Sequence, residues 1–300
     1  MIDASTTVLP RAEWEPVAEA HADRADALTA GHRGRKSRGE KHAVEDFLYE
    51  YYPTRASHLR RWHPGVGVAL EDAPEHANWK FYETDSRGTS VDVDAFLEAR
   101  GQSVAPIERL LKGTASRPAR LGCFGLHEWA MVYHAGQELR HPLPLRLGQA
   151  GTDAVVEANP IACSHFDAFR FFTPDAAPRN ALQLTRADQV SREQPGCLHA
   201  NMDLYKWATK LAPAVPSELA LDAFELAMEI RYVDMQASPY DVRELGLAPI
   251  AIETVEGKSE YARRQGEFAE RASVLRDRLI EACTHIREAA KIEAAETRAH

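Results

Sequence analysis

The hydrophobic pattern is plainest in the second half of the chain. Residues 198–211 and 217–235 carry apolar side chains at helical spacing, and Ser217 after Pro216 suits a helix N-cap. Little of the circumference of the second segment is polar, which predicts a central helix; its apolar positions are Leu219, Leu221, Phe224, Leu226, Met228 and Ile230. A last helix is expected from Ser259, with apolar residues spaced by threes, fours and sevens as far as Ile286.

The first half predicts shorter elements. We expect helices over about 11–28, 43–52, 55–62, 93–100, 106–112 and 121–135. Residues 79–84 alternate like a strand before a turn over 85–90, residues 143–148 predict a short strand, and 162–172 have strand composition. The pattern therefore indicates an α+β, predominantly α-helical fold: a single globular domain with a few short strands and a long C-terminal helix. We place an N-terminal helix and basic loop at 1–41, the main domain at 42–285 and a fraying helix end at 286–300.

Composition narrows the class of protein. A hydrophobic content of 44% and a charged content of 27% are typical of a soluble globular protein. The N-terminus lacks the basic start and apolar run of a signal peptide, and no apolar stretch reaches the roughly 20 residues that a membrane helix needs. Four widely spaced cysteines fit a reducing compartment better than a disulfide scaffold. We therefore expect a cytoplasmic protein without a membrane partner.

Charge is unevenly distributed. The net charge of −9 disfavours a simple nucleic-acid coat protein, because phosphate neutralisation dominates such binding. A basic segment nevertheless runs from His32 to His42, and a second lies at 58–63; their candidate phosphate-binding residues are Arg33, Arg35, Lys36, Arg38, Arg60 and Arg61. The alternative, a solvated basic loop between helices, is the commoner role of a short charge run.

Histidines and cysteines gather between Cys123 and Lys206. This stretch holds three of the four cysteines and five of the thirteen histidines, namely His127, His134, His141, His165 and His199. They fall in segments that are otherwise typical of hydrophobic core. Because titratable groups buried without partners cost several kcal/mol, such a cluster is the first place to expect a site.

One hypothesis for this cluster is a metal centre. Cys163 and His165 share a C-x-H spacing with Cys197 and His199, and thiolate with imidazole suits zinc. The spacing matches no standard zinc motif, and buried cysteines and histidines are commonly plain core residues. Histidines 165 and 199 with Asp167 could alternatively form a face for iron. The leading expectation is no metal; the alternative is zinc or iron bound by His127, His165, His199, Cys163 and Cys197.

A second hypothesis uses carboxylates without metal. Asp167 and Asp203 lie in the two histidine-bearing segments, each three residues before a cation, Arg170 or Lys206, and Glu128 adjoins His127. A carboxylate in an apolar pocket near histidine can act as a general base or stabilise a developing cation. Internal salt bridges are the alternative, and they are the favoured interpretation of a further group, Glu225, Glu229, Arg231 and Asp234. Nearby aromatic residues, including Trp129, Tyr133 and Tyr205, could stack a nucleobase, although most aromatics are core.

Several segments together are similar to one protein family. They read HAVEDFLYEYY, LRRWHPGVG, CFGLHEWAMVYH, PGCLHANMDLYKWA and SPYDV. From about His42 to Leu279 the chain resembles a family of bacterial, largely actinobacterial, proteins commonly labelled 3-methyladenine DNA glycosylase. The resemblance implies DNA repair by hydrolysis of the N-glycosidic bond of an alkylated adenine. It transfers no catalytic residue to this chain.

Our leading hypothesis is a cytoplasmic N-glycosylase-like hydrolase. We expect catalysis by Asp167, Asp203, His165, His199 and Glu128, with an aspartate orienting water or stabilising the sugar cation. The expected substrate-binding residues are His127, Trp129, Tyr133, Arg170, Tyr205 and Lys206, with the basic segment holding phosphates of a nucleic acid or nucleoside. The alternatives are a metal-dependent enzyme acting on a small molecule and a non-catalytic nucleic-acid or protein-binding module. In the latter, the C-terminal helix would form a homodimer.

Overall fold

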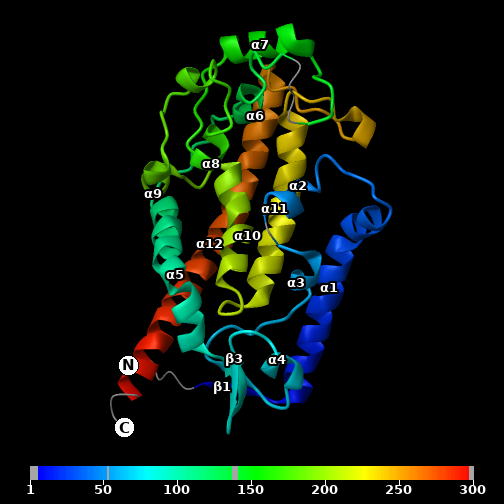
Figure 1. The fold of residues 1–300 in the computed structure, drawn as a ribbon. Coiled ribbons are helices and arrows are strands. Elements are labelled where there is room, and N and C mark those ends of the chain that lie inside the picture. Colours follow the sequence, from blue (N-terminus) through cyan, green and yellow to red (C-terminus); the bar gives the residue numbers. More distant parts are fainter. Residues whose placement is uncertain (1–5, 53, 137–140, 297–300) are drawn as a thin grey trace.

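Three long helices from the second half of the chain form the centre of the fold (Figure 1). The structure is a computed structural model that describes residues 6–52, 54–136 and 141–296. Helix α10 covers Leu198–Leu211, α11 covers Ser217–Ala237 and α12 covers Val255–Glu296. Helix α12 packs against α10, α11 and α5, which covers Val93–Ala115. The predicted central helix and the long C-terminal helix are both present, and the α+β, mostly helical fold class is confirmed.

A small four-stranded sheet closes one end of the helices (Figure 1). Its strand order is β1-β2-β4-β3, over Thr7–Leu9, Val68–Leu70, Gly88–Val91 and Tyr82–Asp85. Strands β1 and β2 pair in parallel, whereas β4 pairs antiparallel with both β2 and β3. The strand predicted over 79–84 is thus present with shifted bounds, and the predicted turn is shorter because β4 begins at Gly88.

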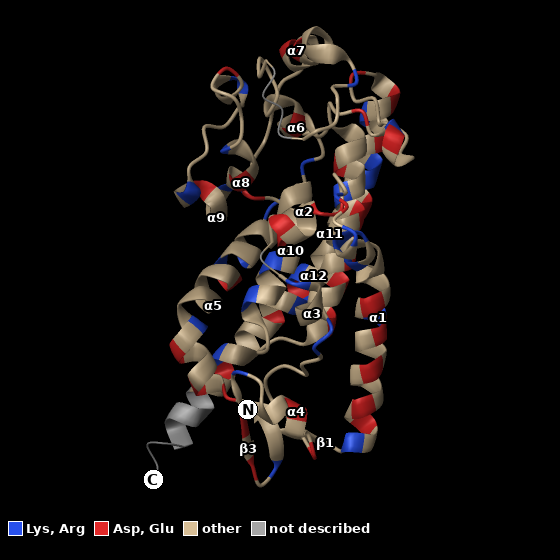
Figure 2. Cartoon of the chain, turned by 45° about the vertical axis from the view of Figure 1, so that its right-hand side comes forward, with Lys and Arg blue, Asp and Glu red and all other residues tan. Residues whose placement is uncertain are grey.

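The remaining helices are mostly short. Helix α1 lies along the outside of the molecule, where Figure 2 shows acidic and basic bands along its length. The opposite end from the sheet is built from α6 to α9 and their loops (Figure 1). The bounds are α1 Arg11–Ser37, α2 Phe47–Glu50, α3 Ala56–Leu59, α4 Pro74–Ala77, α6 Leu126–Ala130, α7 Gly148–Ala158, α8 Phe166–Phe169 and α9 Gln189–Arg192, with 3-10 turns at Ala177–Arg179, Arg186–Asp188 and Arg243–Leu245.

Several predicted elements were wrong in type or extent. Residues 162–172 form no strand but contain the one-turn helix α8, because their aromatic content reflects burial, which helices and strands share. The basic segment is not a loop up to residue 37, since α1 continues to Ser37. Helices predicted over 93–100 and 106–112 are one helix with Pro106 inside it. The helix predicted over 121–135 shrinks to α6, and residues 143–148 contribute only the isolated bridge from Leu145 to Tyr240.

The structure also defines the start of α11 and the end of α12. Pro216, not Ser217, is the N-cap of α11; Ser217 Oγ instead donates to the carbonyl of Arg61 at 3.0 Å. Helix α12 continues to Glu296, and residues 297–300 of the expected fraying end lie outside the described residues. Among the described residues, no helix combines the length and apolar composition that a bilayer crossing requires. The homodimer through α12 stays a prediction; within its own chain this helix packs against α5, α10 and α11.

Candidate active site

A strained turn positions two titratable side chains on α6. Phe124 has φ of 45° and Gly125 has φ of 69°, and such a conformation costs a non-glycine residue about 1–3 kcal/mol. A Cβ at Gly125 would also lie 3.3 Å from the ring of Tyr261. Buried His127 and Glu128 follow at once. The turn that leads into His127 and Glu128 is therefore locally strained.

One buried polar cluster joins α6 to α11. His127 Nε2 donates to Asp234 Oδ1 at 2.9 Å. Arg231 Nη1 donates to Glu128 Oε1 at 3.1 Å and to Asp234 Oδ2 at 3.0 Å. Arg231 Nη2 also lies 3.3 Å from His141 Nε2. Because an unpaired buried charge costs several kcal/mol, these acidic and basic groups hold one another in place.

The environment shifts the pKa values of these groups in different directions. Burial lowers the pKa of His127, but the Asp234 carboxylate outweighs this effect and raises the pKa above its ordinary value. Burial raises the pKa of Asp234, but His127 outweighs it, so the pKa lies below the ordinary range. For Glu128, burial and the nearby Asp234 charge both raise the pKa. Glu128 is therefore the carboxyl group of this cluster that most readily holds a proton.

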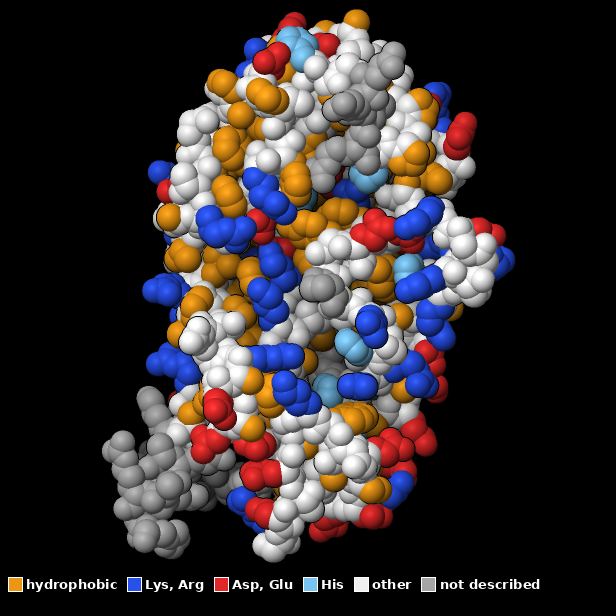
Figure 3. Space-filling view, viewed as in Figure 1, with side chains coloured by type: hydrophobic (Ala, Val, Ile, Leu, Met, Phe, Trp, Pro, Cys, Tyr) orange, Lys and Arg blue, Asp and Glu red, His pale blue; other side chains and the backbone are white. Residues whose placement is uncertain are grey.

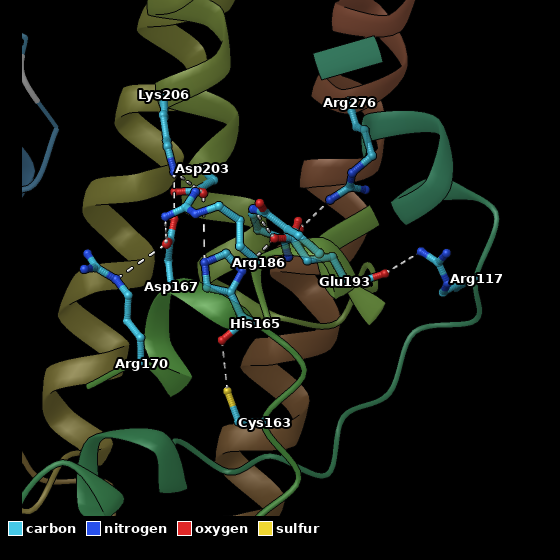
Figure 4. A network of polar contacts seen from close by, with 12 residues as sticks. Arg117, Cys163, His165, Asp167, Arg170, Arg186, Glu193, Asp203, Lys206 and Arg276 are labelled. Carbon is cyan, nitrogen blue, oxygen red and sulfur yellow. Dashed lines mark hydrogen bonds and ion pairs between the residues drawn. The ribbon is translucent and has the colours of Figure 1, made fainter. Parts of the chain in front are cut away.

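A second buried cluster joins α8 to α10 (Figure 4). Lys206 Nζ donates to Asp167 Oδ2 at 3.1 Å and to Asp203 Oδ2 at 3.0 Å. The hydroxyl of Tyr52 donates to Asp203 Oδ1 at 3.0 Å. Burial raises the pKa of Asp167, but the Lys206 charge outweighs it and lowers the pKa below its ordinary value. Asp167 is thus held ionised.

His165 lies beside this second cluster without a well-aligned hydrogen bond to its ring among the described residues. It is 1% exposed. Its Nδ1 lies 3.1 Å from Glu193 Oε1, and its Nε2 lies 3.9 Å from Asp203 Oδ2. Burial lowers the pKa of His165, but the Glu193 carboxylate outweighs it and raises the pKa. The ring is therefore a buried donor whose hydrogen-bonding capacity is only partly used.

His199 connects the two clusters. Its ring centroid lies 4.5 Å from that of His127 and 5.5 Å from that of His165. Burial lowers the pKa of His199, and the positive charge of His127 lowers it further. His199 is consequently a neutral imidazole at neutral pH, able to accept a hydrogen bond.

Both clusters reach the wall of one cavity of about 620 Å³, which we call the polar cavity. Its wall includes the polar side chains of Asp46, Glu128, Asp167, His199 and Arg231, together with the rings of Phe47, Tyr51 and Phe171. The volume falls within the roughly 300–1,000 Å³ of small-ligand sites. A carboxyl group that favours protonation, an ionised carboxylate and a neutral imidazole therefore share a ligand-sized space with aromatic walls.

Metal-donor atoms come together at two places in the described part of the chain. The ligand atoms of one group lie within 4.8 Å of one another, and so do those of the other; the groups are His127, Glu128, His199 and Asp234, and His165, Asp167 and Asp203. A side-chain cation already pairs with the carboxylates of each group, Arg231 in the first and Lys206 in the second. The first group has the nitrogen and oxygen donors that zinc or iron takes, provided that Arg231 moves aside.

The cysteines belong to neither group. Cys163 Sγ lies 3.5 Å from the carbonyl oxygen of His165, to which it donates. Burial raises the pKa of Cys163 to about 12 and raises that of Cys197 well above its ordinary value. Both thiols are therefore protonated at neutral pH. The structure brings His127, His165 and His199 together, but with carboxylates instead of thiols.

The aromatic residues expected to bind substrate lie elsewhere. Trp129 is fully buried, and its Nε1 donates to the carbonyl of Ala237 at 2.8 Å. The hydroxyl of Tyr133 donates to Glu157 at 3.2 Å, and Tyr205 is packed in the hydrophobic core. None of these three rings is part of the wall described for the polar cavity. Their positions give no support to a stacking role; the rings at the cavity are others.

Most residues expected to bind phosphate are paired instead with carboxylates. Arg33 and Arg60 both pair with Asp26, Arg35 pairs with Glu45, and Arg38 pairs with Glu40. Lys36 is exposed on the last turn of α1. Arg61 differs, because it lines a second cavity. Arg170, expected to contact substrate, is exposed with its Nε 3.5 Å from Asp167 Oδ1.

The expected structural pairing of Arg231 with Asp234 is present, at 3.0 Å, and Arg231 also donates to Glu128 of α6. Two other members of the clusters were missed. Tyr52 and Glu193 were not considered. Tyr52 is distant in sequence from Asp203, whereas Glu193 lies inside the stretch from Cys123 to Lys206, and no local motif marks either residue.

Comparison with family models, with curated proteins and with solved structures found no match. The functional argument therefore depends on the site itself.

Proposed function

We propose that the protein is a hydrolase that cleaves the N-glycosidic bond of a nucleobase, with the polar cavity as its active site. The observation that carries the proposal is the shared opening of Glu128, Asp167 and His199 on one aromatic-walled cavity. Groups whose environments push their pKa values apart are the usual means of placing an acid and a base in one site. The rings of Phe47, Tyr51 and Phe171 offer flat surfaces for a heterocycle.

The roles follow from the protonation states. Ionised Asp167 stabilises positive charge that develops on the sugar and takes a proton from the attacking water, whose oxygen bonds to the anomeric carbon. Protonated Glu128 donates to a leaving base that is not already cationic through alkylation. Neutral His199 accepts a hydrogen bond from the water or base. Asp203, the other predicted aspartate, is 1% exposed and bonded to Tyr52 and Lys206, so it positions Lys206 instead of contacting substrate.

The proposal is tested by base release from alkylated DNA and from alkylated nucleosides, measured chromatographically. Wild type and Asp72→Asn should release base equally, because Asp72 is a matched control whose side chain is 73% exposed and lines neither cavity. Asp167→Asn should lose about 100-fold or more in rate, with its cooperative unfolding retained. Equal rates for Asp167→Asn and wild type would remove this mechanism.

A metal-dependent enzyme acting on a small molecule is the second candidate, because four donor atoms from His127, Glu128, His199 and Asp234 lie within 4.8 Å of one another. Against it stands Arg231, which already neutralises the two carboxylates of this set. Elemental mass spectrometry on protein purified without a metal-affinity tag separates the candidates. About one zinc or iron per chain would favour the metal enzyme. An equal rate of base release in metal-free and metal-containing protein would favour the first proposal.

A further inference from the structure

A second cavity, of about 580 Å³, lies between α3, α5 and the end of α10. We call it the basic cavity, because its wall carries five cations and, among the described residues, no aspartate or glutamate: the cations are Arg61, Lys80, Arg100, Lys206 and Lys210. Figure 3 shows Lys, Arg and His side chains ringing a hollow below the middle of the molecule. In a chain of net charge −9, such a concentration of one sign marks a place that attracts anions.

The cations of this cavity differ from the other cations of the chain in what neutralises them. In the described part of the chain, no carboxylate pairs with Arg61, Lys80, Arg100 or Lys210, whereas many other arginines form ion pairs. Lys80 instead lies over the ring of Phe81 at 4.6 Å. An aromatic face attracts a cation without cancelling its charge. These cations therefore remain available to an anion.

Backbone and ring contacts hold two of the arginines at the cavity. Arg100 Nη1 donates to the carbonyls of Lys210 and Ala212 at 3.2 and 2.8 Å. The guanidinium of Arg61 lies 5.5 Å from the centroid of the Trp79 ring. Holding both side chains reduces the conformational entropy that ligand binding would cost.

Neutral hydrogen-bonding groups accompany the cations. His63 lines the cavity, and Nδ1 of its ring lies 2.9 Å from the hydroxyl of Tyr82. Burial, together with the nearby charges of His76 and Arg61, lowers the pKa of His63 to about 3. The ring is therefore uncharged, and Thr54 and Thr209 add hydroxyl groups to the wall. Such a mixture of cations and neutral donors suits the oxygens of a phosphate.

We propose that the basic cavity binds the phosphate of a small phosphorylated molecule the size of a nucleotide. The volume suits such a ligand. The cations are gathered in one cavity, and the chain is acidic as a whole, which favours a small phosphorylated molecule over the extended backbone of a nucleic acid. Lys206 belongs to both sites: it donates to Asp167 and Asp203 and also lines the basic cavity.

The test is calorimetric titration of the full chain with pyrophosphate and with ribose 5-phosphate, using uncharged ribose for comparison. Saturable binding of the two phosphate compounds near one per chain, without binding of ribose, is expected. The double variant Arg61→Gln/Lys210→Gln should weaken the affinity for pyrophosphate about tenfold or more. The matched control Arg109→Gln/Arg192→Gln removes two exposed cations outside both cavities and should leave the affinity unchanged.

Three outcomes would overturn the proposal. They are the absence of saturable phosphate binding, an equal loss in the control variant, and preferential binding of single-stranded DNA over ribose 5-phosphate that is itself lost in Arg61→Gln/Lys210→Gln. Amide chemical shifts of the wild-type chain give a second measurement, which does not depend on the folding of a variant. Pyrophosphate should shift the amide signals of residues around Arg61, Lys80 and Lys210, and shifts confined to other regions would contradict the assignment. Because no turnover is measured, failure here leaves the hydrolase proposal standing.

Discussion

The polar cavity and the basic cavity differ in whether the charges of their side chains are neutralised. At the polar cavity, buried Arg231 pairs with Glu128 and Asp234, half-buried Lys206 pairs with Asp167 of the wall, and His127 pairs with Asp234 behind it. At the basic cavity, four cations have no carboxylate partner among the described residues. Internally compensated charge fixes side chains and shifts their pKa values, which suits chemistry. Cations that no carboxylate neutralises can attract an anionic ligand to a surface cavity. Lys206 connects the two, because it lines the basic cavity and donates to Asp167 of the polar cavity.

Removing a compensating cation from the polar cavity should have the largest effect on folding. In Arg231→Met, the Glu128 and Asp234 carboxylates stay buried without their partner, which costs about 3–5 kcal/mol. Urea denaturation followed by circular dichroism measures the loss. Arg243→Gln removes an arginine whose pair with Asp241 is on the surface, and it should change stability little. Equal effects of the two substitutions would show that the buried compensation is unimportant.

Activity should depend on pH through the two carboxyl groups of the polar cavity. Release of a base that is not already cationic requires protonated Glu128, so it should fall as pH rises through the raised pKa of this group, above 4.5. It also requires ionised Asp167, so it should fall when pH drops below about 3.8. Glu128→Gln should lower the rate by about 100-fold or more for a base that needs protonation, and it should abolish the fall at higher pH. An unchanged pH profile would exclude Glu128 as the acid.

Stability should also pass through a maximum with pH. The lowered pKa of Asp234 gives stability that is present above its unfolded value of about 3.8 and is lost as pH falls through the folded value. The raised pKa of His127 gives stability that is complete below about 6.5 and is lost as pH rises through the folded value. Urea midpoints measured across pH should therefore be flatter in Asp234→Asn than in wild type. A parallel displacement of the two curves would contradict this linkage.

A smaller loss of folding stability is expected at the edge of the second cluster, which contains Asp167, Asp203 and Lys206. Tyr52→Phe removes the hydroxyl that donates to Asp203 and leaves Lys206 in place, which should cost about 1.5–3 kcal/mol. Tyr133→Phe is the matched control, because its hydroxyl bonds to Glu157 at the surface. Thermal unfolding of both variants gives the comparison, and a larger loss in Tyr133→Phe would be inconsistent with it.

The smallest effect on stability is expected at the basic cavity. Lys80→Gln removes an exposed cation that has no carboxylate partner among the described residues, so the unliganded protein should keep its unfolding midpoint or gain slightly from reduced repulsion. Differential scanning fluorimetry in low salt measures this. A marked destabilisation would mean that the cations of this cavity are structural and would break the contrast between the two cavities.

Local sequence pattern was sufficient for the long helices and insufficient for what lies around them. Residues 198–211 match α10 because a strong 3.6-residue period and a proline-glycine turn both act locally. Strands β1 and β2 pair across about sixty residues, and such pairing leaves no local trace. Residues 162–172 were predicted as a strand because buried aromatics carry no information on period over so short a segment.

The candidate site could be located but not assembled from sequence. Histidines in apolar segments correctly indicated where polar groups are buried, and His127, His165 and His199 do meet. Which carboxylates face them depends on how α6, α8, α10 and α11 pack. Asp167 reaches the polar cavity and Asp203 does not, although their local sequences look alike. In the basic segment, by contrast, the acidic partners are close in sequence: Arg33 pairs with Asp26, Arg35 with Glu45 and Arg38 with Glu40.

Base release from alkylated DNA by wild type, Asp167→Asn and Asp72→Asn tests the central claim most directly. We predict turnover by wild type and Asp72→Asn and a loss of about 100-fold or more in Asp167→Asn. Turnover by Asp167→Asn at the wild-type rate, or no turnover by folded wild-type protein on either DNA or nucleosides, would contradict the account.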